Sequence, residues 1–246
     1  MNYFAHALPY FSDPYFMAGT AAPDWLSVAD RKVRVRKRLI DSYLADSDNN
    51  AAIKNASLRN HEQDNPEQQY QAVARGARQH LEDDDWFHRL PSFAEVSLQL
   101  AHEFRVAIGP DDGFRAGFLG HIVTEMLLDR LLIQQAPQLL DRYYEILSGL
   151  DAEKIQRGVN QVATNPTERL AMLVPRFIDE KFLYDYLELP KMLVRLNQVL
   201  KRVKLPLLPD HIVDTLEASN QIVEARHQEM LPALVLQAVQ SDDSDS

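Results

Sequence analysis

The sequence predicts an all-α fold, a bundle of many helices, and three observations lead to this class. Of the 246 residues, 46% are hydrophobic and 25% are charged, which is typical of a chain that buries a substantial core. Apolar residues recur at three- and four-residue spacing, as they do along one face of a helix. The chain has 8 glycines and 13 prolines, and we find no sequence signal for a β-hairpin.

The helices are expected between the prolines and the polar stretches of the chain. Helix-start signals stand at Asn65-Pro66, Ser92, Pro110-Asp111 and Asn165-Pro166. Polar residues 47–65 predict a loop. The predicted helices span roughly residues 3–8, 14–21, 24–46, 66–88, 92–107, 111–134, 136–148, 151–163, 167–187, 190–203 and 209–238. We expect a single domain over residues 1–240 and a disordered acidic tail at 241–246.

Composition excludes several classes of function. The formal charge of −10 argues against nucleic acid as a partner, although residues 31–38, RKVRVRKR, form a basic exception. With no cysteine, a metal site must use nitrogen and oxygen ligands. No window has the roughly 18 consecutive apolar residues of a membrane span, and no signal sequence is visible, so a cytoplasmic protein is the default expectation.

The stretch GARQHLEDDDWFHRLP, residues 76–91, places His80, Asp84 and His88 at four-residue spacing. Positions four apart on a helix lie on one side of it, so these side chains form one stripe if the helix continues towards Pro91. Two imidazoles and a carboxylate are good ligands for a divalent transition metal. The alternative is a solvated acidic turn with incidental histidines.

A second pair, His121 and Glu125, interrupts a very apolar helix within residues 117–132. An imidazole and a carboxylate in such surroundings need a partner or a cation, because burying them unpaired is unfavourable. A buried His–Glu hydrogen bond is the simpler alternative. Asp129, one turn later, is expected to accept a hydrogen bond from a ligand or to pair with Arg130 or Arg142.

The N-terminal region adds His6, in the apolar segment MNYFAHALPYF, and Asp24, after Pro23. Either residue has an ordinary structural explanation. A histidine of this kind is often a satisfied core residue, and an aspartate after a proline is often a helix cap.

In combination these segments resemble the acyl carrier protein phosphodiesterase family, distant members of the HD-type metal-dependent phosphohydrolases. MNYFAH matches the family's M-N-[FY]-x-A-H, and GTAAPD, residues 19–24, matches G-N-x-x-x-D with threonine replacing asparagine. GARQHLEDDDWFH, residues 76–88, matches G-x-x-x-H-x-x-x-D-x-[FL]-x-D, with histidine at the last position. His121 and Glu125 align with two aspartates four apart. A fainter similarity is to the zinc-dependent phospholipase C group.

The resemblance implies an HD-like bundle with additional C-terminal helices and a metal-dependent phosphodiesterase that uses metal-activated water. One or two Zn, Mn or Fe ions would be bound, since His88 and His121 replace family carboxylates. Asp24 or Glu125 is expected as general base or leaving-group acid. The substrate would be a small phosphoester, or an acyl carrier protein that loses phosphopantetheine. The implied metal ligands are His6, Asp24, His80, Asp84, His88, His121 and Glu125.

A different class of function also fits the sequence. The chain would then be a non-catalytic helical scaffold or partner-binding protein, with a structural metal or with none. The apolar face of residues 231–239 suits a helix–helix contact, either in the core or in a homodimer.

Overall fold

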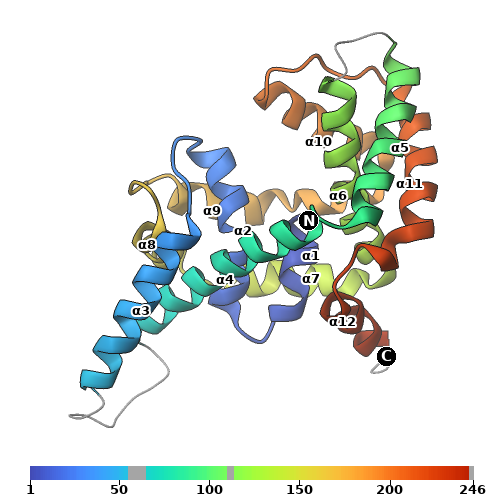
Figure 1. Cartoon of the computed structure of the whole chain (residues 1–246). Helices are drawn as coiled ribbons and strands as arrows, with labels where there is room; N and C mark the ends of the chain where they lie inside the picture. Colours follow the sequence, from blue (N-terminus) through green and yellow to red (C-terminus); the bar gives the residue numbers. More distant parts are fainter. Residues whose placement is uncertain (55–64, 110–113, 244–246) are drawn as a thin grey trace. The chain divides into compact units, whose positions relative to one another are not determined.

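The computed structural model describes residues 1–54, 65–109 and 114–243, and within these residues it is built of helices (Figure 1). The only β-type feature of the described residues is an isolated antiparallel bridge between Val35 and Ala163. The predicted all-α class is therefore confirmed. Among the same residues, no helix combines the length and the hydropathy required to cross a bilayer.

The described residues form a succession of helices, in which η denotes a 3-10 helix. In chain order they are α1 (Tyr3–Ala7), η1 (Leu8–Tyr10), α2 (Pro14–Ala29), α3 (Lys37–Lys54), α4 (Pro66–Phe87), α5 (Pro91–Ile108), α6 (Phe114–Gln135), α7 (Pro137–Ser148), α8 (Ala152–Val162), α9 (Leu170–Glu180), η2 (Phe182–Leu187), α10 (Leu189–Arg202), α11 (Ile212–Arg226), η3 (His227–Glu229) and α12 (Ala233–Asp243).

The chain divides into two compact units. Unit 1 comprises Met1–Ala5, Asp84–Asp141 and Lys181–Ser246. Unit 2 comprises His6–Asp83 and Arg142–Glu180. Helices α1, α4 and α7 each pass from one unit to the other along the chain.

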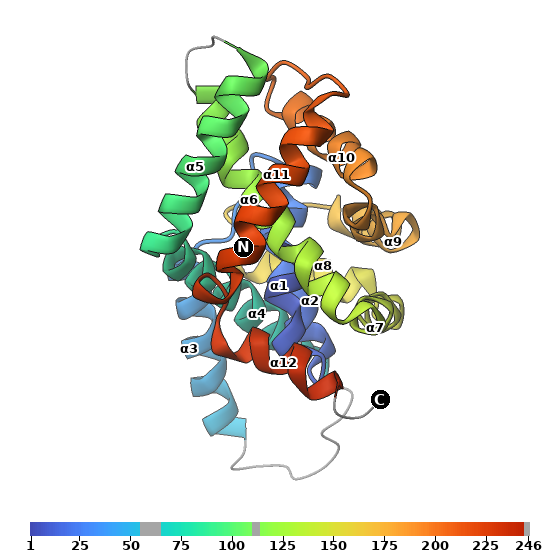
Figure 2. The same cartoon turned by 90° about the vertical axis from the view of Figure 1, so that its right-hand side faces the viewer.

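In unit 1, helices α5, α6 and α11 lie side by side (Figures 1 and 2). A Cβ atom on Gly120 of α6 would lie 2.1 Å from the carbonyl oxygen of Ser97 on α5, so only glycine allows the two backbones to approach this closely. The shared core contains Val96, Leu100, Phe104, Leu119, Val123, Leu127, Leu216 and Val223. Helix α6 is central in this unit, as its apolar sequence predicts.

Arg130 of α6 fastens the segment η2 to the core of unit 1. Its buried guanidinium donates hydrogen bonds to the carbonyl oxygens of Tyr186, at 2.7 Å, and of Leu187, and to Asn220 Oδ1 at 3.2 Å. The first two hydrogen bonds satisfy carbonyl groups at the C-terminal end of η2, and the third reaches a side chain of α11. One side chain therefore links α6, η2 and α11.

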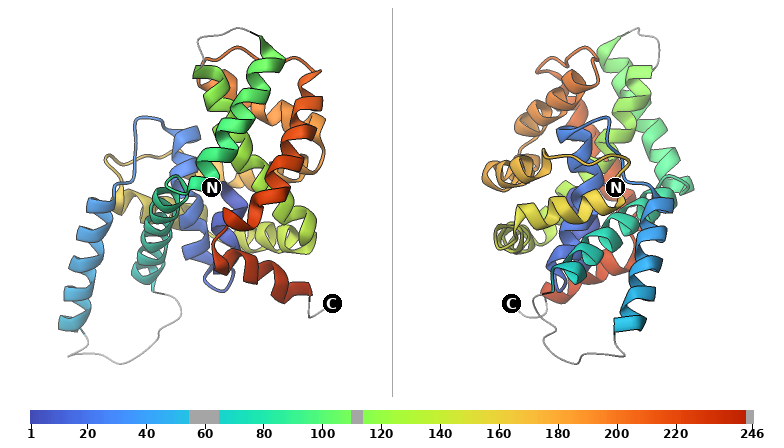
Figure 3. Two further views of the ribbon diagram at one scale, coloured as in Figure 1. Left: turned by 45° about the vertical axis from the view of Figure 1, so that its right-hand side comes forward. Right: turned by 90° about the vertical axis from the view of Figure 1, so that its left-hand side faces the viewer.

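In unit 2, α2 packs against α8 and α9, and α3 packs against α8 (Figure 3). Helices α2 and α4 cross at Gly19 and Gly76. A Cβ atom on Gly19 would lie 2.3 Å from Val73 O, and one on Gly76 would lie 2.0 Å from Phe16 O. The two backbones therefore touch at this crossing, and neither glycine can be replaced without moving a helix.

The predicted boundaries at 14–21 and 24–46 are wrong. Helix α2 continues through Pro23 to Ala29, because proline removes only one intrahelical hydrogen bond and α2 is held by packing on both sides of it. After a turn at Arg31 and Lys32, the chain is not helical up to Arg36. Val33 and Val35 are buried, and Arg34 and Arg36 are exposed, which is the alternation of a strand rather than of a helix.

Other boundaries differ at positions where the apolar pattern gives no stop signal. Helix α3 continues to Lys54, into the predicted loop at 47–65, of which residues 55–64 lie outside the described residues. The predicted helix 167–187 is interrupted at Lys181, which adopts a left-handed conformation with φ 43°. The predicted helix 209–238 is divided at η3. Helix α12 includes residues 241–243 of the predicted tail, and 244–246 lie outside the described residues.

Candidate metal centre

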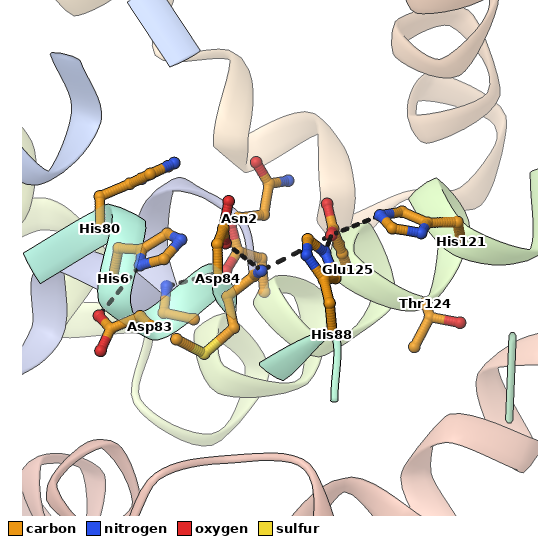
Figure 4. Close-up of polar contacts among 12 residues, drawn as sticks. Asn2, His6, His80, Asp83, Asp84, His88, His121, Thr124 and Glu125 are labelled. Carbon is orange, nitrogen blue, oxygen red and sulfur yellow. Dashed lines mark hydrogen bonds and ion pairs between the residues drawn. The ribbon is translucent and has the colours of Figure 1, made fainter. Parts of the chain in front are cut away.

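Three predicted ligands, His88, His121 and Glu125, converge in unit 1 (Figure 4). Glu125 Oε1 lies 3.2 Å from His88 Nε2 and 3.1 Å from His121 Nε2. One ligand atom from each of the three residues lies within 4.8 Å of the other two. Such a set matches the nitrogen and oxygen donors that Zn²⁺ and related cations use.

The sequence explains how these side chains meet. His121 and Glu125 lie one turn apart on α6, so they share a face. His88 follows Phe87, the last residue of α4, but its N–H still donates to Asp84 O at 3.0 Å, which keeps it on the helical path. The ring of Phe93 lies 5.3 Å from that of His88 and 5.0 Å from that of His121, so it supports both imidazoles.

The three ligands differ in their exposure. The side chains of His88 and His121 are 37% and 45% exposed, whereas that of Glu125 is 11% exposed. The imidazoles therefore line the open side of the cluster and the carboxylate lies at its base. A cation held here would remain accessible from solvent.

The charge of Glu125 is set by its neighbours. Burial alone would raise its pKa, but the ammonium group of Met1 and the hydrogen bonds from His121 and His88 outweigh burial and lower the pKa to about 2. The same ammonium nitrogen lies 3.0 Å from Asp84 Oδ1 and 3.6 Å from Glu125 Oε1. Two carboxylates thus face one positive charge beside the two imidazoles.

Asp129, one turn further along α6, is fully buried and serves the backbone. It accepts hydrogen bonds from the N–H groups of Phe4, at 3.0 Å, and Ala5, at 2.9 Å. Burial raises its pKa to about 7, although these two hydrogen bonds act in the opposite direction. The expected partners were a metal ligand or an arginine, and the contacts with α1 correct this expectation: Asp129 holds the start of α1 on α6.

In unit 2, the rings of His6 and His80 are stacked, with centroids 4.2 Å apart. Both side chains are buried. His6 Nδ1 lies 3.2 Å from Asp83 Oδ2, a contact drawn in Figure 4, and His80 Nδ1 lies 2.8 Å from Thr20 O. The structure therefore pairs two predicted ligands from distant parts of the sequence.

The glycine crossing of α2 and α4 positions His80. Gly76 precedes His80 by one helical turn, so the contact between the two backbones brings the imidazole against the Thr20 carbonyl on α2. Asp24 is half-buried on α2, one turn after Thr20. Its carboxylate is not among the ligand atoms that group closely within the described residues, so its role as a ligand stays a prediction.

Sequence reasoning missed several residues near the predicted ligands. Asp83 contacts His6, whereas Asp85, two residues later, pairs with Arg89 at the surface. No sequence signal marks Phe93 or the Thr20 carbonyl, because both contacts depend on tertiary packing.

Comparison with known proteins identified no relative of this chain: no family model, no curated protein and no solved structure matches it.

Proposed function

We propose that this protein is a metal-dependent phosphoesterase that hydrolyses a phosphodiester. The observation that carries the proposal is the convergence of His88 Nε2 and His121 Nε2 on Glu125 Oε1. Three protein ligands leave further coordination positions for water and substrate, which is the usual arrangement of catalytic metal sites, whereas structural sites are closed by four.

The donor set fits a divalent transition metal. Two imidazoles and a carboxylate favour Zn, Mn or Fe over Mg or Ca, which prefer oxygen ligands. With a pKa of about 2, Glu125 is anionic throughout the neutral range, and this suits a ligand better than a leaving-group acid. His6 and His80 supply further imidazoles, so the proposal covers one or two ions.

When bound, the cation would polarise the phosphoryl oxygens and lower the pKa of a bound water towards neutrality. The half-exposed imidazoles of His88 and His121 leave the substrate side open. Asp84, whose side chain is 30% exposed, faces the same charge as Glu125 and suits the role of proton acceptor. The predicted role of Asp24 as general base remains part of the proposal.

The basic segment 31–38 supports an anionic substrate. Arg31, Lys32, Arg34 and Arg36 are exposed in a protein whose formal charge is −10. Such a segment would attract a phosphate ester. An acyl carrier protein carrying phosphopantetheine remains a specific candidate substrate. The proposal also includes an HD-like arrangement of the helices, a cytoplasmic location and a homodimer.

The alternative class is a scaffold in which the same cluster is structural. A structural metal would stabilise the fold without hydrolysis, and a fourth protein ligand would close the site. Exposure of both imidazoles argues for the open, catalytic form.

The experiment is metal analysis combined with hydrolysis of bis-p-nitrophenyl phosphate. We expect bound transition metal and hydrolysis in the unchanged protein. Glu125→Gln should abolish hydrolysis, because the amide lacks the ligand's charge. Glu95→Gln is the matched control, since Glu95 forms only a surface ion pair with Arg226. Protein that binds no metal, or hydrolysis that survives Glu125→Gln, would contradict the proposal.

A further inference from the structure

His6 and His80 are each held at Nδ1 by an oxygen atom of unit 2. Asp83 Oδ2 is the partner of His6 and Thr20 O is the partner of His80, at 3.2 and 2.8 Å. Asp83 is itself fixed, because its other oxygen, Oδ1, accepts a hydrogen bond from Gln79 Nε2 at 2.8 Å. Both imidazoles are therefore fixed in position and rotation.

These contacts decide which ring nitrogen carries the proton. A carbonyl oxygen has no proton to give, so His80 Nδ1 must be the donor to Thr20 O, and an ionised carboxylate imposes the same direction on His6. In a neutral imidazole the proton at Nδ1 leaves the lone pair at Nε2. Metal-binding histidines are usually arranged in this way, with the second nitrogen donating to a carboxylate or a carbonyl.

We propose that Asp83 is a positioning residue that holds His6 in the tautomer able to bind a cation through Nε2, as the Thr20 carbonyl does for His80. This inference rests on the proposed function only in requiring that the chain bind a divalent cation. Asp83 itself is not a ligand in it.

Two aspartates of α4, Asp83 and Asp85, provide a matched comparison. The side chain of Asp83 is 17% exposed and contacts a buried imidazole, whereas that of Asp85 is 64% exposed and pairs with Arg89 one turn away. Replacement by asparagine preserves shape at both positions. Only at position 83 does the new amide meet a ring nitrogen, to which its N–H can donate, and this stabilises the opposite tautomer.

The test uses the full chain labelled with ¹⁵N at histidine, at pH 8 and free of metal, with the ring signals assigned from His6→Gln and His80→Gln. We expect the Nδ1–H tautomer for both histidines in the unchanged protein. Asp83→Asn should move His6 to the Nε2–H tautomer and leave His80 as it was. Asp85→Asn should change neither ring.

Addition of Zn²⁺ then measures the consequence for binding. Zn²⁺ should shift both ring signals in the unchanged protein, and Asp83→Asn should weaken this response about 10- to 100-fold, as is usual when the partner of a metal-binding histidine is removed. Gln79→Met provides a milder variant that frees one Asp83 oxygen. It should weaken Zn²⁺ binding to a smaller degree. This variant tests the proposal even if Asp83→Asn does not fold.

The possible failures are distinguishable. A His6 tautomer that is unaffected by Asp83→Asn, with unchanged Zn²⁺ binding, would overturn the positioning role alone. An unchanged protein that binds no Zn²⁺, Mn²⁺ or Fe²⁺ would overturn the proposed function and with it the purpose of the arrangement, even where the tautomers are as expected.

Discussion

At the scale of single residues, helical spacing predicted correctly that His121 and Glu125 share one face of α6. The spacing rule works for this pair because α6 is regular over both positions. It grouped His88 with His80 and Asp84, whereas the structure brings His88 to Glu125. It does not reach the contacts of Asp83 and Asp129, whose partners are His6 and the start of α1. Those partners are distant in sequence, so nothing local announces them.

The buried Asp129 makes the free energy of unfolding depend on pH. Its pKa is about 7 in the folded protein, against 3.8 for an exposed aspartate. Between these values the folded chain keeps a proton that the unfolded chain has lost. Asp129 therefore stabilises the fold fully below about pH 4, and this contribution falls by up to about 1.4 kcal/mol per pH unit until about pH 7.

Asp129→Asn should remove this dependence, because the amide does not titrate. Urea unfolding from pH 4 to 8 measures the free energy of unfolding of both proteins. The value for the variant minus the value for the unchanged protein should increase with pH up to about pH 7. Asp179→Asn, at an exposed position on α9, is the control and should give parallel curves. Parallel curves for Asp129→Asn would show that Asp129 is not protonated in the fold.

At the scale of helices, the glycines distinguish close backbone contacts from open positions. Gly120 and Gly117 lie one turn apart on α6, but a Cβ atom meets the Ser97 carbonyl at 2.1 Å from Gly120 and no atom within 4 Å from Gly117. The crossing at Gly120 positions His121, and the crossing at Gly76 positions His80. Gly120 and Gly76 thus allow the close helix crossings that position these candidate ligands.

The two glycines of α6 should respond in opposite directions to alanine. Gly120→Ala should lower the free energy of unfolding by about 1–3 kcal/mol, because α5 and α6 must separate. Gly117→Ala should raise it by about 0.5–1 kcal/mol, since alanine has the higher helix propensity and enough room. Urea denaturation measures both. Equal effects of the two substitutions would mean that the crossing is loosely packed.

The positions of the helices followed from the sequence better than their ends. Apolar periodicity placed most helices to within a few residues, whereas it joined segments that tertiary packing separates. Lys181 breaks a continuous pattern by adopting a left-handed φ of 43°, a conformation no sequence rule assigns to lysine. The strand-like alternation of Val33 and Val35 was readable, but one short bridge does not create a visible sheet signal.

At the scale of the whole molecule, a bound cation should link the candidate ligands to the thermal stability of the fold. A ligand that binds only the folded chain stabilises it by mass action, by about 2.7 kcal/mol at 100 times its Kd. The unchanged protein contains two groups of imidazoles, so removal of one group should diminish the effect without abolishing it.

Thermal unfolding with and without Zn²⁺ measures this link. At 100 times the Kd, Tm should rise by roughly 5–10 °C for a chain of this size. The rise should be smaller in Glu125→Gln, and EDTA should reverse it in both proteins. A Tm unaffected by Zn²⁺ at every concentration would show that the folded chain holds no such ion. Mg²⁺ serves as the control, because it prefers oxygen ligands.

The bridge between Val35 and Ala163 closes the chain on itself over a long span of sequence. The Thr164 N–H donates to Arg34 O at 2.8 Å, and the Arg34 N–H donates to Thr164 Oγ1 at 3.1 Å. This small clasp ties the segment before α3 to the end of α8. If a protease cut the backbone between these segments, this contact would act together with the packing of α2 and α3 on α8 to hold the two pieces of unit 2 together.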